Sequence, residues 1–117
     1  MAASHFKLDN LMVVVDRNDF QQTGLGVDIM STENLCAKWR SFGWDTEEVD
    51  GHNCSSLFEA FSVTSESLKP RAFIANTVKG KGISFAENNN SWHHAVLTKA
   101  NYESALKELE MHEYAKK

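Results

Sequence analysis

The sequence predicts an α/β fold in which helices pack on a mainly parallel sheet. Strand and helix signals alternate three times along the chain, the order expected when helical crossovers join parallel strands. The first strand, Leu11–Val15, is continuously apolar, as is typical of strands covered on both faces. The length of 117 residues suits one domain, and the 42% hydrophobic and 24% charged composition is that of a folded protein.

A helix is expected after the first strand. Ser31 and Thr32 are its candidate cap residues, because their hydroxyl groups can accept hydrogen bonds from the free N–H groups at a helix start. Apolar residues then recur at helical spacing up to Phe42, and Gly43 is placed to end the helix. This apolar face is expected to lie on the sheet.

The remaining elements continue the alternation. Trp44–Val49 is a weaker strand candidate, and a second helix is expected to begin near Ser55 and to end before Pro70. Arg71–Val78 supplies the third strand. A last helix with an apolar stripe is expected over roughly Thr98–His112.

Charge and composition exclude several classes of protein. A net charge of -4 argues against binding to nucleic acid or to anionic lipid, both of which favour basic surfaces. No stretch approaches the roughly 20 apolar residues that span a bilayer, and the start of the chain lacks the apolar core of a signal peptide, so a cytoplasmic protein is expected. Cys36 and Cys54 lack CxxC spacing and are predicted to be reduced, largely buried thiols.

Two polar segments follow predicted strands, where ligands of parallel sheets collect. The segment Asp16–Asp19 comes directly after the first strand, and the amide oxygen of Asn18 within it suits Mg²⁺, although such residues also form ordinary turns. The segment Lys79–Gly82 (KGKG) allows close backbone approach to a phosphate, or forms a solvated basic turn; it lacks the P-loop ending. The adjacent His93 and His94 have no partners at zinc-finger spacing, so structural zinc is not expected.

Four ordered segments carry a family resemblance: LDNLMVVVDRNDFQQTG, KWRSFGWDTEEVDGHN, NTVKGKGISFAENNNSWHH and YESALKELE. Over essentially the whole chain they resemble the transketolase family, particularly the N-terminal subunits of two-subunit bacterial and archaeal forms. The resemblance implies a three-layer sandwich with a mainly parallel sheet, the thiamine diphosphate-binding fold, in incomplete form. Residues 1–117 would be the carboxyl half of the diphosphate-binding domain.

The resemblance also implies an activity, the transfer of a two-carbon ketol unit between sugar phosphates with thiamine diphosphate and a divalent cation, usually Mg²⁺. Asn18 falls on the asparagine that ends the family's GDG…N motif and ligates the metal. Phe20 falls where a backbone carbonyl completes the metal coordination. Gln22 lies near the thiazolium ring in relatives, and Lys79 lies beside the diphosphate. All four are thus expected to contact the cofactor or its metal.

His93 matches the histidine of the family's WHG motif, which in relatives reaches the diphosphate and the reacting sugar. His93 is therefore the expected catalytic residue as well as a cofactor contact. His94 stands where that motif has glycine, a departure that affects the path of the loop.

The GDG half of the cofactor motif does not fit into the 17 residues before Asn18. The expected function is therefore that of a component of a split transketolase, inactive when isolated. Its partners would be one chain with the GDG half and another with the pyrimidine-binding domain, or further copies of itself associating through the exposed edge of the first strand. The alternatives are a deoxyxylulose-phosphate synthase-like enzyme and a non-catalytic remnant or scaffold subunit.

Overall fold

A computed structural model describes residues 1–63 and 67–114, which fall into two compact units. The first unit contains residues 1–18 and 31–77, and the second begins with residues 19–30 and resumes at residue 78.

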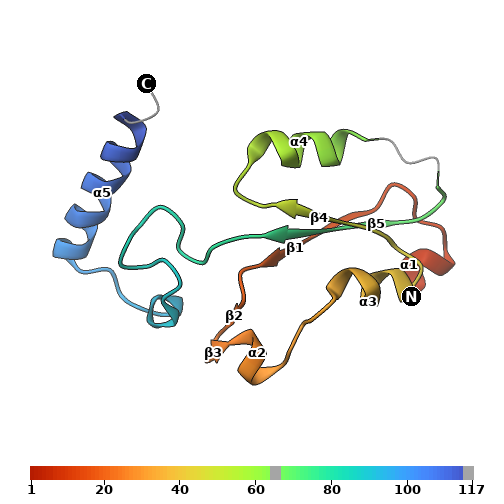
Figure 1. Ribbon diagram of the computed structural model, residues 1–117, viewed down its shortest axis with the longest axis horizontal. Helices are drawn as coiled ribbons and strands as arrows, with labels where there is room; N and C mark the ends of the chain where they lie inside the picture. Colours follow the sequence, from red (N-terminus) through yellow and green to blue (C-terminus); the bar gives the residue numbers. More distant parts are fainter. Residues whose placement is uncertain (64–66, 115–117) are drawn as a thin grey trace. The chain divides into compact units, whose positions relative to one another are not determined.

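The first unit is built on a parallel sheet of three strands in the order β1-β5-β4 (Figure 1). The strands are β1 (Met12–Arg17), β4 (Asp45–Asp50) and β5 (Arg71–Asn76). Both neighbours pair with the whole of β5, so the three strands begin and end level. This parallel sheet confirms the predicted α/β class.

The central strand is buried because it has a strand on each side and a helix on each face. In Figure 1, α4 (Cys54–Ser62) lies on one side of the sheet and α3 (Leu35–Ser41) on the other. On the α4 side, Phe73 and Ala75 pack with Ala60 in the core. Side chains alternate along a strand, so Ala72 and Ile74 point to the opposite face, and neither is exposed. The three-layer arrangement of the prediction is therefore present.

The prediction that the first strand is covered on both faces is wrong for the described residues. The side chains of Met12 and Val14 are 49% and 51% exposed. Among the described strands β1 pairs only with β5, and α4 packs on β4 at the other edge of the sheet. One face of β1 is consequently open.

The start of α3 differs from the prediction, whereas α4 begins near Ser55 as predicted. Asn34, not Ser31 or Thr32, caps α3: its side-chain oxygen accepts a 3.1 Å hydrogen bond from the Ala37 N–H. Asn53 caps α4 in the same way. Cys36 is buried as predicted, whereas Cys54 is exposed, because it opens α4 beside the cap, away from the core. A short helix, α1 (Ala2–His5), precedes the sheet.

The second unit contains elements that periodicity did not predict. β2 (Phe20–Gln21) and β3 (Gly24–Leu25) form a small antiparallel hairpin, followed by α2 (Gly26–Ile29). A loop from Val78 leads to the 3₁₀ helix η1 (Asn90–His93) and then to α5 (Lys99–Tyr114), which confirms the predicted last helix. No helix among the described residues of the chain is long and apolar enough to cross a membrane.

Candidate functional site

The carboxyl ends of the three strands meet at one edge of the first unit. Arg17 and Asp50 both stand level with Asn76 in the register of the sheet. The Thr77 N–H donates a 3.0 Å hydrogen bond to the Arg17 carbonyl, which carries the pairing one step past the strand ends. Asn18 directly follows Arg17, so this half-buried amide lies at the edge where parallel sheets bind ligands.

Close packing fixes this edge. The Gly51 N–H donates a 2.9 Å hydrogen bond to the Asn76 carbonyl, which brings the turn after β4 against the end of β5. A Cβ atom on Gly51 would lie 2.4 Å from Cγ2 of Thr77, so a side chain there would force the two segments apart. The Thr77 hydroxyl in turn donates a hydrogen bond to the Asp16 carboxylate.

The second unit begins with a tight turn that leads into Phe20. Asp19 has a φ of 62°, in the left-handed region that aspartate tolerates better than most residues. Its carbonyl accepts a 2.8 Å hydrogen bond from the Gly26 N–H, and Phe20 pairs with Leu25 in the hairpin. The backbone at Phe20 is thus held by the hairpin, as a carbonyl ligand would require.

Gln22 is held by the segment around η1, within the second unit. Its side-chain Nε2 lies 3.0 Å from Nε2 of His94, and its backbone carbonyl accepts a 3.1 Å hydrogen bond from Nδ2 of Asn90. The rings of His93 and His94 meet edge to face, with their centroids 4.5 Å apart. The fold therefore brings Gln22, His93 and His94 into one cluster.

The Lys79 loop is shaped by two glycines. Gly80 and Gly82 have φ values of 71° and 96°, which only glycine adopts without strain. The Lys79 carbonyl accepts a 2.9 Å hydrogen bond from the Asn88 N–H, which closes the loop. Lys81 lies 3.6 Å from the Glu87 carboxylate, whereas Lys79 forms no ion pair with any of the described residues. Of the two cations, Lys79 is the one that no carboxylate in the described part of the chain neutralises.

The predicted site residues therefore divide between the units. Asn18 directly follows β1 in the first unit, whereas Phe20, Gln22, Lys79 and His93 belong to the second. The sequence did not single out Asn90 as the residue that holds the Gln22 backbone. The signal available was the run of three asparagines before Ser91, since asparagine side chains commonly bond to nearby backbone.

By atom type, and taken one residue at a time, the donors of these residues are of the kind that bind a diphosphate and a divalent cation. An amide oxygen and a backbone carbonyl are hard ligands of the kind Mg²⁺ accepts, and it fills its remaining positions with phosphate oxygens and water. An ammonium and an imidazole are donors to phosphate. Within the two described ranges, no group of three histidine, cysteine, aspartate or glutamate side chains could hold a metal ion by itself.

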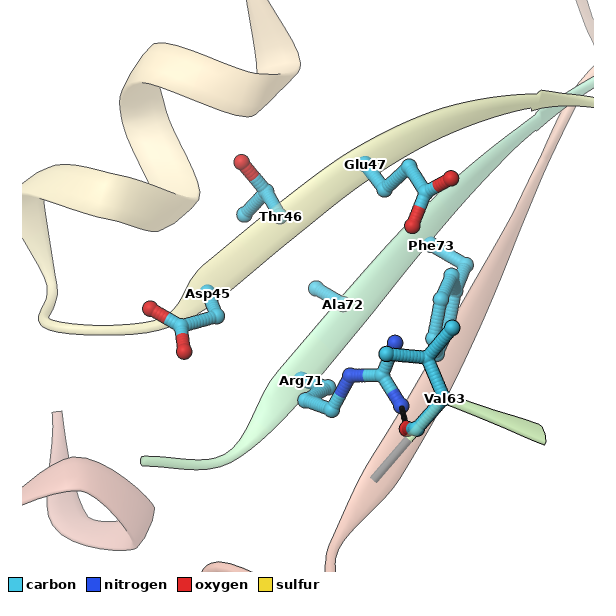
Figure 2. Close-up of a pocket in the computed structure, with 7 residues that line it drawn as sticks. All are labelled: Asp45, Thr46, Glu47, Val63, Arg71, Ala72 and Phe73. Carbon is cyan, nitrogen blue, oxygen red and sulfur yellow. Dashed lines mark hydrogen bonds between the residues drawn. The ribbon is translucent and has the colours of Figure 1, made fainter. Parts of the chain in front are cut away.

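A separate cavity of about 190 Å³ lies at the amino ends of β4 and β5 (Figure 2). The buried guanidinium of Arg71 lines it and donates hydrogen bonds to the carbonyls of Val63 and Ala60, at 2.6 and 2.9 Å. Ala60 lies in the last turn of α4, and Val63 directly follows the helix. Arg71 therefore caps the carboxyl end of α4. None of the predicted site residues lines this cavity.

Proteins of known name are similar in sequence to most of this chain. An apulose-4-phosphate transketolase subunit of Phocaeicola vulgatus is 39% identical over 110 residues, covering 93% of this chain and 39% of the relative. The 6-deoxy-6-sulfo-D-fructose transketolase subunit SqwG of a Clostridium species is 37% identical, covering 94% of this chain and 40% of the relative. The chain thus spans about two fifths of the length of these relatives.

Solved structures and a family description agree with these relatives. The transketolase of Campylobacter jejuni superimposes with a TM-score of 0.83 at 26% identity, covering 93% of this chain and 17% of that one. A second transketolase structure, from Pichia stipitis, gives a TM-score of 0.75 at 26% identity, covering 93% and 16%. The family described as "Transketolase, thiamine diphosphate binding domain" matches residues 1–116. The chain belongs to the thiamine diphosphate-binding domain family of transketolases.

Proposed function

We propose that this chain is the diphosphate-side component of a transketolase that transfers a two-carbon ketol unit between sugar phosphates. The observation that carries the proposal is the cluster of Gln22, His93 and His94 in a chain whose residues 1–116 match the family. An amide and two imidazoles in one place offer hydrogen bonds to a phosphate and to sugar hydroxyls.

Each site residue has a role in this proposal. Asn18 and Phe20 hold a divalent cation such as Mg²⁺, one through its amide oxygen and the other through its backbone carbonyl. Lys79 neutralises the diphosphate, and Gln22 lies against the thiazolium ring. His93 contacts the diphosphate and, as the catalytic residue, the reacting sugar. Bound thiamine diphosphate supplies the ylid chemistry, so these residues anchor and orient rather than attack.

The proposal includes partners. Residues 1–117 correspond to the carboxyl half of the diphosphate domain, and they act with the parts of a transketolase that carry the GDG half and the pyrimidine-binding domain. The two subunits compared above each exceed this chain more than twofold in length. The open face of β1 supports a neighbour on that side or a second copy of the chain. The complex is expected to work in the cytoplasm.

The test compares the chain alone with the assembled complex. Isothermal titration with Mg²⁺ and thiamine diphosphate is expected to show no micromolar binding to the chain alone, and binding once partners encoded beside its gene are co-purified. Ketol transfer is then measured on the complex. Micromolar binding by the chain alone would contradict the need for partners.

A variant pair assigns the metal ligand within that complex. Asn18→Ala is expected to abolish binding of the cofactor that depends on Mg²⁺, because it removes the amide oxygen. Asn10→Ala removes an exposed amide of the same unit and serves as the matched control. Equal binding by the two variants would show that Asn18 is not a ligand.

A further inference from the structure

We infer that His94 is a positioning residue of this site, which fixes the side-chain amide of Gln22. The inference rests on the proposed function for the consequence of that contact, but not for the contact itself. The two side chains come from residues 72 positions apart in the chain, and their Nε2 atoms lie 3.0 Å apart. Both belong to the second unit.

The chemistry of the pair defines what His94 does. An amide nitrogen donates hydrogen bonds and cannot accept them, so the facing imidazole nitrogen accepts, and the neutral ring carries its proton on Nδ1. If the amide is turned over, its oxygen accepts from the other tautomer of the same ring. In both arrangements the end of the Gln22 side chain is tied to the His94 ring.

Gln22 needs such a support because its side chain is exposed and has several rotatable bonds. The same segment of chain also holds its backbone, through the 3.1 Å hydrogen bond from Asn90. Asn90 therefore sets where the Gln22 backbone lies, and His94 sets where its amide points. Two contacts from one short segment thus restrain both the backbone and the side-chain end of this glutamine.

His94 has a second contact, the edge-to-face packing with His93 at an interplanar angle of 88°. Loss of the ring could thus act through His93 as well as through Gln22. Two substitutions separate the effects: His94→Phe keeps an aromatic ring for His93 but removes the hydrogen bond, whereas His94→Gln removes the ring but keeps a hydrogen-bonding end of similar reach.

The first experiment follows the Gln22 side-chain amide by NMR in the full chain, without cofactor. Its resonance pair is assigned as the one lost in Gln22→Ala. We expect it to shift to free-glutamine values in His94→Phe and to stay dispersed in His94→Gln. His5→Phe, which removes an exposed histidine of the first unit, is the control. An unmoved Gln22 resonance in folded His94→Phe, judged by circular dichroism, would overturn the inference.

The second experiment uses the complex assembled with its partners. His94→Phe is expected to lower kcat about tenfold with little change in sugar KM, because a misaligned positioning group costs rate more than binding. His94→Gln should recover to within about threefold of the parent. The double variant Gln22→Ala/His94→Phe should be no slower than Gln22→Ala, since both changes remove one contact. Additive losses would contradict a role through Gln22.

The two experiments separate the two hypotheses. A Gln22 resonance that depends on His94, in a complex that transfers no ketol units, would leave the contact established and refute the proposed function. Ketol transfer that is indifferent to His94→Phe would leave the proposed function standing and overturn the positioning role.

Discussion

The side-chain hydroxyl of Thr77 donates a hydrogen bond to the carboxylate of Asp16, joining the carboxyl ends of β5 and β1. Thr77→Val keeps the shape of the side chain but removes this donor, and it is expected to lower the free energy of unfolding by about 1 kcal/mol. Urea unfolding measures the change. Thr77→Ser, which keeps the hydroxyl, is the control and should lose less. An unchanged midpoint in Thr77→Val would show that the bond adds no stability.

Gly51 and Thr77 are predicted to be energetically coupled. Gly51→Ala would place a Cβ atom 2.4 Å from Cγ2 of Thr77 and is expected to cost roughly 1–3 kcal/mol of unfolding free energy through overpacking. The double variant Gly51→Ala/Thr77→Ser lacks the γ-methyl group. It should therefore be destabilised less than the sum of the two single variants, by about 0.5 kcal/mol or more. Strict additivity in urea unfolding would contradict the contact.

The two glycines of the Lys79 loop are expected to differ in their tolerance of alanine. Gly80→Ala meets both a positive φ and a backbone clash, with the new Cβ 2.4 Å from the Ala86 carbonyl oxygen. Gly82→Ala meets only the positive φ, since its nearest contact would be 3.7 Å away. Left-handed backbone costs a non-glycine residue roughly 1–2 kcal/mol. Gly82→Ala is therefore expected to lower the free energy of unfolding by that amount, and Gly80→Ala is expected to lower it further.

Thermal unfolding of both variants, compared with the parent chain, checks the difference. In the assembled complex, Gly80→Ala should also weaken cofactor binding more than Gly82→Ala, because it displaces the loop that begins at Lys79. Equal losses of stability would show that the Ala86 contact does not constrain the loop.

Hydrophobic pattern was sufficient to predict the parallel sheet and the main helices. The apolar run of β5 is buried, and burial leaves a trace of this kind in the sequence. The predicted apolar stripe of α5 is a different case, since Tyr102, Leu106 and Leu109 are all exposed. The start of α3 was less predictable: Ser31 and Thr32 were the candidate caps, but Asn34, a few residues further on and equally able to accept a hydrogen bond, caps the helix. Coverage of β1 could not be predicted from its own residues, because it depends on which element lies over that strand.

The candidate site was predictable only where residue type carries chemistry. Asn18 directly follows β1, and Lys79 follows β5 after Thr77 and Val78, so both come after strands as the alternation predicted. Their roles rest on the family resemblance and stay predictions. The contact between Gln22 and His94 spans 72 positions and has no periodic trace in sequence. Contacts of this kind are set by loop paths, for which local patterns carry little information.

The contact between Glu108 of α5 and the loop after Lys79 is predicted to stabilise the chain. Its carboxylate accepts hydrogen bonds from the backbone N–H and the hydroxyl of Ser84, at 2.6 and 2.8 Å. Glu108→Ala removes the acceptor for both and should cost about 1–2 kcal/mol of stability, whereas Ser84→Ala removes only the hydroxyl donor and should cost less. Glu110→Ala, at an exposed position of the same helix, is the control. A loss as small as that of the control would contradict the link.

The open face of β1 is expected to drive association of the isolated chain. Met12 and Val14 are half exposed on a strand that pairs on one side only among the described strands, and such edges recruit other strands unless a charge blocks them. Val14→Lys should therefore shift the chain toward the monomer in light scattering at micromolar concentration. Val96→Lys, which charges an 87% exposed valine of the second unit, should leave association unchanged. A parent chain that is strictly monomeric would show that this edge does not self-associate.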